Sequence, residues 1–251
     1  MARFETLDNI SHQDVKIKPY FSEDLGDNVA STITFITEFA EVQKEYPILI
    51  RKEAESGLYQ AVALFGIQKN ENLFLSKPDP KRQKNPGWNG NYIPAAIARG
   101  PFSIGVPRPS GDTGQEKGAM VNIDMESPKV SKEEGLPLFL EHGGNSAYLE
   151  QISSTLNLIR DGMHLNKPMF DAYVKYSLLD DVTINIDLDN GDRHKISGFY
   201  TINTEALSAL KGEALEDLNK SGFLQAAYFI LASLSNVRKL INIKNSQLRE
   251  S

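Results

Sequence analysis

The first half of the chain alternates apolar and polar residues over short segments, a pattern that predicts antiparallel strands. Residues 48–51 and 59–65 are expected to pair as a hairpin around a polar turn at 53–57. Four more segments predict strands through alternation or β-branched residues: HQDVKIKPYF, STITFITEF, NENLFL and AMVNIDM. Consecutive strands with short turns favour an antiparallel meander.

Beyond residue 140 the apolar positions recur every three or four residues, which predicts helices. NKPMFDAYVKYSLL begins a second helix with Pro168 in its expected first turn. VTINIDLDNGDRHKISGFYTI predicts a hairpin with its turn at 189–191, and three helical segments follow. The most apolar of these, FLQAAYFILASLSNVRKLINI, is expected to be buried. The first helix, NSAYLEQISSTLNLIRDGM, shows the spacing at Tyr148, Ile152, Leu156 and Ile159.

These elements define an α+β fold class. An N-terminal antiparallel β meander with long irregular loops is expected to precede C-terminal helices that enclose one β-hairpin. A chain of 251 residues is long enough to bury its own core. We expect a single domain over 1–251, or a subdivision into a β-rich part at 1–130 and a mainly helical part at 140–245.

Charge and cysteine content exclude several classes of function. With 27 basic and 33 acidic residues the net charge is −6, which disfavours binding to nucleic-acid backbones or anionic lipid. The chain has no cysteine, so disulfides, thiolate metal sites and a cysteine nucleophile are excluded.

Apolar runs such as AAYFILASL are too short to insert into a membrane. The first residues lack a Sec-type apolar segment, so a cytoplasmic location is expected, with signal-independent export left open.

The irregular segment 76–118 draws attention because long loops in compact proteins often carry function. It contains WNGNYIPAAIARGPF, with the only tryptophan of the chain. In a functional interpretation, Trp88, Tyr92 and Phe102 offer flat contact surfaces and Arg99 grips a carboxylate or carbonyl of a ligand. In a structural interpretation, Trp88 and Phe102 fill the edge of the core, and Arg99 pairs with an acidic residue.

Histidine and carboxylate positions give one weak metal hypothesis. His12 and Asp14 match the start of a two-histidine-one-carboxylate iron triad, and residues two apart on a strand share a face. Nucleotide-binding, serine-hydrolase and zinc-protease motifs do not occur in the sequence. No cofactor or resident metal is therefore expected.

Six segments in order resemble the SapC-like family of bacterial proteins, from about residue 38 to 240. The resemblance implies an association with surface layers, as the family name indicates, and it carries no catalytic residues over to this chain. The family pattern usually has a second basic residue where Ala98 stands here. The segments are EYPILIRK, ALFGIQKNENLFL, the tryptophan with YIPAAIARGPF, GLPLFLEHGG, GDRHKISGFYTINTEALSAL and GFLQAAYFILASLSNVRKL.

The sequence therefore favours a non-enzymatic binding or accessory protein. It would hold a peptide or partner protein through the 76–118 region, with Trp88, Tyr92, Arg99 and Phe102 as contacts. Two alternatives stay open, a surface-layer assembly component and an iron-dependent oxygenase that uses His12 and Asp14. The sequence leaves the oligomeric state undetermined.

Overall fold

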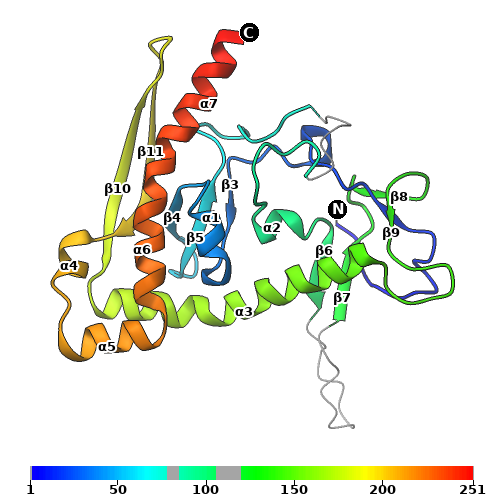
Figure 1. Cartoon of the computed structure of the whole chain (residues 1–251), viewed down its shortest axis with the longest axis horizontal. Coiled ribbons are helices and arrows are strands. Elements are labelled where there is room, and N and C mark those ends of the chain that lie inside the picture. The colour runs from blue at the N-terminus through cyan, green and yellow to red at the C-terminus, as the bar shows by residue number, and fades with distance from the viewer. Residues whose placement is uncertain (1, 78–84, 106–119, 251) are drawn as a thin grey trace.

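The computed structural model describes residues 2–77, 85–105 and 120–250 and confirms an α+β fold (Figure 1). Its largest sheet has five antiparallel strands in the order β10-β11-β4-β5-β3. The strands are β3 (Ser31–Ile33), β4 (Ile48–Lys52), β5 (Tyr59–Leu64), β10 (Leu179–Asp187) and β11 (Arg193–Ile202). Both predicted hairpins are therefore confirmed, and β11 joins them by pairing Tyr200 with Ile50.

Two smaller antiparallel sheets lie on the other side of the molecule (Figure 1). One has the order β1-β7-β6, with β1 at Phe4–Thr6, β6 at Phe102–Gly105 and β7 at Met120–Asp124. The other has the order β8-β2-β9, with β2 at Lys16–Ile17, β8 at Val130–Ser131 and β9 at Leu136–Pro137. The expected strand AMVNIDM is confirmed as β7, whereas HQDVKIKPYF contributes only the two residues of β2.

A single long helix, α3 (Ala147–Lys175), replaces the two helices expected between residues 145 and 179. Pro168 stands inside this helix, so its placement in a first turn was wrong. The helix runs below the large sheet in the view of Figure 1 and reaches β6 and β7 with its first half. Gly162 permits the close approach of the segment around Phe35, because an added Cβ would lie 2.4 Å from the Cβ of Phe35.

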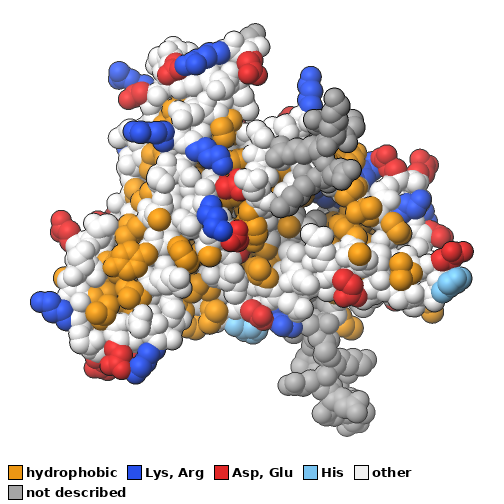
Figure 2. All heavy atoms as spheres, viewed as in Figure 1, with side chains coloured by type: hydrophobic (Ala, Val, Ile, Leu, Met, Phe, Trp, Pro, Cys, Tyr) orange, Lys and Arg blue, Asp and Glu red, His pale blue; other side chains and the backbone are white. Residues whose placement is uncertain are grey.

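The C-terminal helices cover the large sheet. They are α4 (Thr204–Ser208), α5 (Gly212–Lys220), α6 (Phe223–Ser233), a 3₁₀ turn η3 (Leu234–Asn236) and α7 (Val237–Glu250). Helix α6 packs on β4 and β11, and its Phe223, Ala227 and Ile230 are buried. The expected burial of α6 holds for one face of the helix only, because Tyr228 is 54% exposed. Figure 2 shows hydrophobic side chains gathered on the side of the molecule where α5 and α6 lie.

One expected strand is confirmed only in its first three residues, and another is irregular. STITFITEF begins with β3 but continues as a 3₁₀ turn, η2 (Ile36–Glu38), and the short helix α1 (Phe39–Val42). NENLFL forms no strand and contributes one isolated bridge, between Leu75 and Trp88. A short 3₁₀ turn η1 (Glu23–Leu25) and helix α2 (Ala95–Ala98) complete the described elements.

Buried apolar residues form two principal clusters, and α3 connects them. The larger cluster surrounds the five-stranded sheet and includes Met169, Phe170 and Tyr173 of α3. The second lies between β6, β7 and the first half of α3, where Ile152 and Leu156 pack. Each cluster draws on residues from both the 1–130 and the 140–245 parts of the chain.

Candidate functional site

Trp88 is a core residue. Its side chain is 0% exposed and is surrounded by aromatic rings: the Phe65 centroid lies 5.2 Å away edge-on, the Phe21 centroid 5.5 Å away, and the Phe74 ring stacks at 6.2 Å. The indole nitrogen donates a hydrogen bond of 2.9 Å to the hydroxyl of Tyr46. The expectation of an outward-facing indole is therefore wrong, because an indole with no exposed surface contacts nothing outside the core.

The other three expected contact residues do not gather around Trp88 in one ligand-binding surface. Phe102 is 0% exposed and belongs to the second core cluster, whereas Trp88 belongs to the first. Arg99 is half-buried, and its Nη1 donates to the carbonyl oxygen of Phe102. Burial lowers the pKa of Arg99, and no carboxylate within the described ranges forms an ion pair with it.

Two buried carboxylates fasten the 88–102 segment to the loop and helix that precede β4. Glu38 accepts hydrogen bonds from the Tyr92 hydroxyl at 2.7 Å and from the Ala95 amide at 2.8 Å, both at Oε2. Glu45 accepts from the backbone amides of Asn91 and Tyr92 at 2.9 and 3.1 Å. Burial raises the pKa of Glu38, and the donated hydrogen bonds oppose that shift. The structural interpretation therefore accounts for Tyr92.

The outer side of this fastened segment borders a pocket of about 460 Å³, which we name the α2–α3 pocket (Figure 1 shows the two helices). Ile93 and Ile97 line it from the segment around α2, and Ile152 lines it from α3. Ala98 and Gly100 also contribute to the wall, and Arg99 does not. Chain segments remote in sequence complete it: residues 18–21, 85–86, Lys129 and Leu136.

A buried ion pair supports the pocket wall. Lys129 Nζ lies 2.8 Å from Asp27 Oδ2, and their side chains are only 9% and 6% exposed. The same ammonium lies 4.3 Å from the centroid of Phe21, a favourable cation–π distance. Gly87 lets the 85–86 segment approach Phe21: its φ is +80°, and an added Cβ would lie 2.0 Å from the Phe21 carbonyl oxygen. Lys129 and Phe21 are thereby held in place.

Polar side chains lie along the same wall. Lys18, Tyr20, Gln151 and Thr155 line the pocket together with Tyr148. Burial raises the pKa of the Tyr148 phenol, so this group stays protonated at neutral pH. Within the described part of the chain no hydrogen bond reaches the Tyr148 hydroxyl. The pocket therefore combines an apolar body with hydrogen-bond donors.

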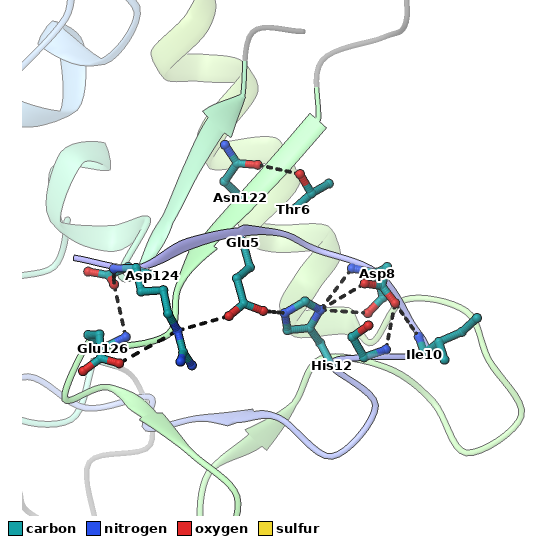
Figure 3. Close-up of polar contacts among 10 residues, drawn as sticks. Glu5, Thr6, Asp8, Ile10, His12, Asn122, Asp124 and Glu126 are labelled. Atoms are coloured by element: carbon teal, nitrogen blue, oxygen red, sulfur yellow. Dashed lines mark hydrogen bonds and ion pairs between the residues drawn. The ribbon is translucent and has the colours of Figure 1, made fainter. Parts of the chain in front are cut away.

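His12 and Asp14 are not arranged as the start of an iron triad. His12 is 2% exposed, and its ring nitrogens lie 3.4 Å from Glu5 and 3.5 Å from Asp8 (Figure 3), whereas Asp14 is exposed. Hydrogen bonds from the backbone amides of Ser11 and Ile10 lower the pKa of Asp8. Among residues 2–77, 85–105 and 120–250 there is no group of three or more histidines and carboxylates able to hold a metal ion.

Sequence reasoning missed most of the pocket. Tyr148 was assigned to the apolar face of its helix, and that face is confirmed by the burial of Ile152, Leu156 and Ile159. Nothing in the sequence around Lys18 and Lys129 indicated that these residues line a pocket. The long irregular segment 76–118 was the signal that pointed to this region. The remaining parts of the 76–118 region, residues 78–84 and 106–119, lie outside the described residues.

None of the helices in the described ranges combines the length and apolarity that a membrane crossing requires.

Comparison with known proteins identifies the family. No curated protein and no solved structure matches the chain. Residues 7–240 match the SapC family, a range that extends the sequence resemblance back to residue 7 and includes every described residue of the α2–α3 pocket. The chain belongs to the SapC family.

Proposed function

We propose that this protein is a non-enzymatic binding or accessory protein that holds a peptide, or a segment of a partner protein, in the α2–α3 pocket. The observation that carries the proposal is the pocket itself, about 460 Å³ in volume and bordered by the irregular segment that the sequence singled out. That volume lies within the usual range for ligand pockets, roughly 300–1,000 Å³.

The composition of the wall favours binding over catalysis. Its apolar part, with Ile93, Ile97 and Ile152, suits apolar side chains of a peptide, and its polar residues suit backbone groups. The described wall contains no histidine, aspartate or glutamate that could act as a general base. Trp88 and the two clamping carboxylates serve as scaffold behind this wall.

Site-specific photo-crosslinking tests the proposal. Gln151 lines the pocket and is exposed, so p-benzoylphenylalanine at this position in the native host should capture the bound partner. Arg193, 87% exposed on the β10–β11 hairpin, is the control position. We expect a discrete protein adduct at 151 and none at 193. Equal adducts at both positions, or none at 151, would contradict the proposal.

A pocket-filling variant sharpens the same experiment. Ala98→Trp places an indole in the pocket, whereas Ala40→Trp makes the same change at an exposed position of α1. The adduct at 151 should be lost with Ala98→Trp and retained with Ala40→Trp. Retention in both would show that the captured protein does not enter the pocket.

A further inference from the structure

The charged side chains in the described lining of the α2–α3 pocket are both lysines. Lys18 and Lys129 contribute ammonium groups, and no aspartate or glutamate occurs in the described lining. Each ammonium also has a carboxylate partner outside that lining, Asp27 for Lys129 and Glu134 for Lys18. An anionic group that enters the pocket meets ammonium groups on its wall, whereas a cationic group meets no carboxylate in the described lining.

The two lysines differ in what they can offer to a ligand. Lys129 is already neutralised by Asp27 at 2.8 Å and is buried, so its charge serves the scaffold. Lys18 is 24% exposed and pairs at 3.1 Å with Glu134, whose side chain is 65% exposed. An ion pair with a solvent-exposed carboxylate contributes little to stability, and an ammonium has three donors. Lys18 can therefore accept a second anionic partner.

Tyr148 supplies a neutral donor on the same wall. Its ring is held against Phe102, with centroids 6.5 Å apart, and its hydroxyl has no hydrogen-bond partner among the residues described. Because the hydroxyl stays protonated at neutral pH, it can donate to an acceptor that enters the pocket. A carboxylate oxygen is a strong acceptor for such a donor.

The rest of the wall is complementary to an apolar group that lies beside the anion. Ile93 and Ile97 from the α2 segment and Ile152 from α3 form an aliphatic surface across the pocket. A volume of about 460 Å³ accommodates a few side chains and is too small for a folded domain. An acidic residue with an apolar neighbour in the same peptide matches both parts of the wall.

We infer that the α2–α3 pocket recognises an acidic side chain, aspartate or glutamate, flanked by apolar residues in a peptide segment of the partner. Lys18 and the Tyr148 hydroxyl receive the carboxylate, and the three isoleucines contact the apolar neighbours. This inference rests on the proposed function, since it names the chemistry of the segment that the pocket holds.

Three blocked tripeptides test the inference: acetyl-Leu-Glu-Phe-amide, and the same peptide with Gln or Lys at the centre. Each is titrated into the full chain with labelled isoleucine methyl groups and followed by NMR. We expect shifts at Ile93, Ile97 and Ile152 and none at Ile230, which is buried in α6 and does not line the pocket. The Glu peptide should bind at least tenfold more tightly than the Gln peptide, and the Lys peptide most weakly.

Two variants connect the preference to the named groups. Lys18→Met should reduce the preference for the Glu peptide over the Gln peptide to less than threefold. The matched control is Lys16→Met, because Lys16 lies in β2 and does not line the pocket, and it should leave the preference unchanged. Tyr148→Phe keeps the ring that packs on Phe102 and removes only the hydroxyl. It should weaken the binding of the Glu peptide three- to tenfold. The methyl spectra report directly that each variant is folded.

The possible results separate this inference from the proposed function. Equal affinities for the Glu and Gln peptides, with pocket shifts, would overturn the acidic anchor and leave peptide binding in place. Absence of pocket shifts with all three peptides would overturn the inference, while crosslinking at Gln151 would still decide the proposed function. Binding of 4-phenylbutyrate with the same Lys18 dependence, but of no tripeptide, would show that the pocket takes a free carboxylate and would overturn the peptide source.

Discussion

Replacement of Trp88 by phenylalanine distinguishes a scaffold residue from a ligand contact. The change removes the hydrogen bond from the indole to Tyr46, which contributes about 1 kcal/mol. It also removes part of a side chain that is 0% exposed and touches three phenylalanine rings, which costs roughly 1–2 kcal/mol more. We therefore expect Trp88→Phe to lower the free energy of unfolding by about 2–3 kcal/mol.

Urea unfolding monitored by circular dichroism measures this loss, because the variant lacks the only tryptophan of the chain as a fluorescent probe. Affinity for the Glu tripeptide, measured on the folded fraction at low urea, should change less than twofold. A variant that unfolds at the wild-type urea concentration but loses peptide binding would refute the scaffold role. It would restore the interpretation of Trp88 as a direct contact.

Three further substitutions test the supports of the pocket. Glu38→Gln should lower the free energy of unfolding by about 2 kcal/mol, because an amide group then faces the Tyr92 hydroxyl and the Ala95 amide, which donated hydrogen bonds to the carboxylate. The pKa of Glu38 is raised in the folded protein, so the folded state binds more protons than the unfolded chain between the ordinary pKa of 4.5 and the folded pKa, and stability falls as pH rises through that window. Urea titrations from pH 4 to 8 should show a smaller fall in the variant, and an equal fall would contradict this role. Asp27→Asn leaves the Lys129 ammonium buried without a counter-charge and should lower the free energy of unfolding by about 3–5 kcal/mol. Most of this loss should be recovered when Lys129 is also changed to Met. Additive losses of the two changes in thermal unfolding would contradict the pairing. Gly87→Ala forces a methyl group into the Phe21 carbonyl at positive φ and should lower the thermal midpoint by several degrees, whereas an unchanged midpoint would disprove the close contact.

Periodic segments were the part of the fold that the sequence predicted well. The apolar run at Ile48–Ile50 and the turn before Tyr59 specify the β4–β5 hairpin, because strand pairing there depends on local pattern and burial. The β10–β11 hairpin follows its Asp-Asn-Gly turn in the same way. Pro168 misled the prediction, since α3 continues through it where neighbouring packing outweighs the lost backbone hydrogen bond.

The candidate site was less predictable because its parts are distant in sequence. Trp88 stands in an irregular segment without periodicity, so nothing local indicated which way its indole points. Its burial depends on Phe21, Phe65 and Phe74, and on the hydroxyl of Tyr46. Contacts of this kind follow from tertiary structure alone, and the same holds for the pairing of Asp27 with Lys129 across 102 positions of the chain.

Hydrogen exchange of the protein with and without its crosslinked partner tests the central claim most directly. If the partner occupies the α2–α3 pocket, backbone amides at residues 93–100 and 148–155 should exchange more slowly in the complex, while those of the β10–β11 hairpin keep their rates. Protection confined to the hairpin, or to the outer face of α6, with unchanged exchange around the pocket, would contradict the account.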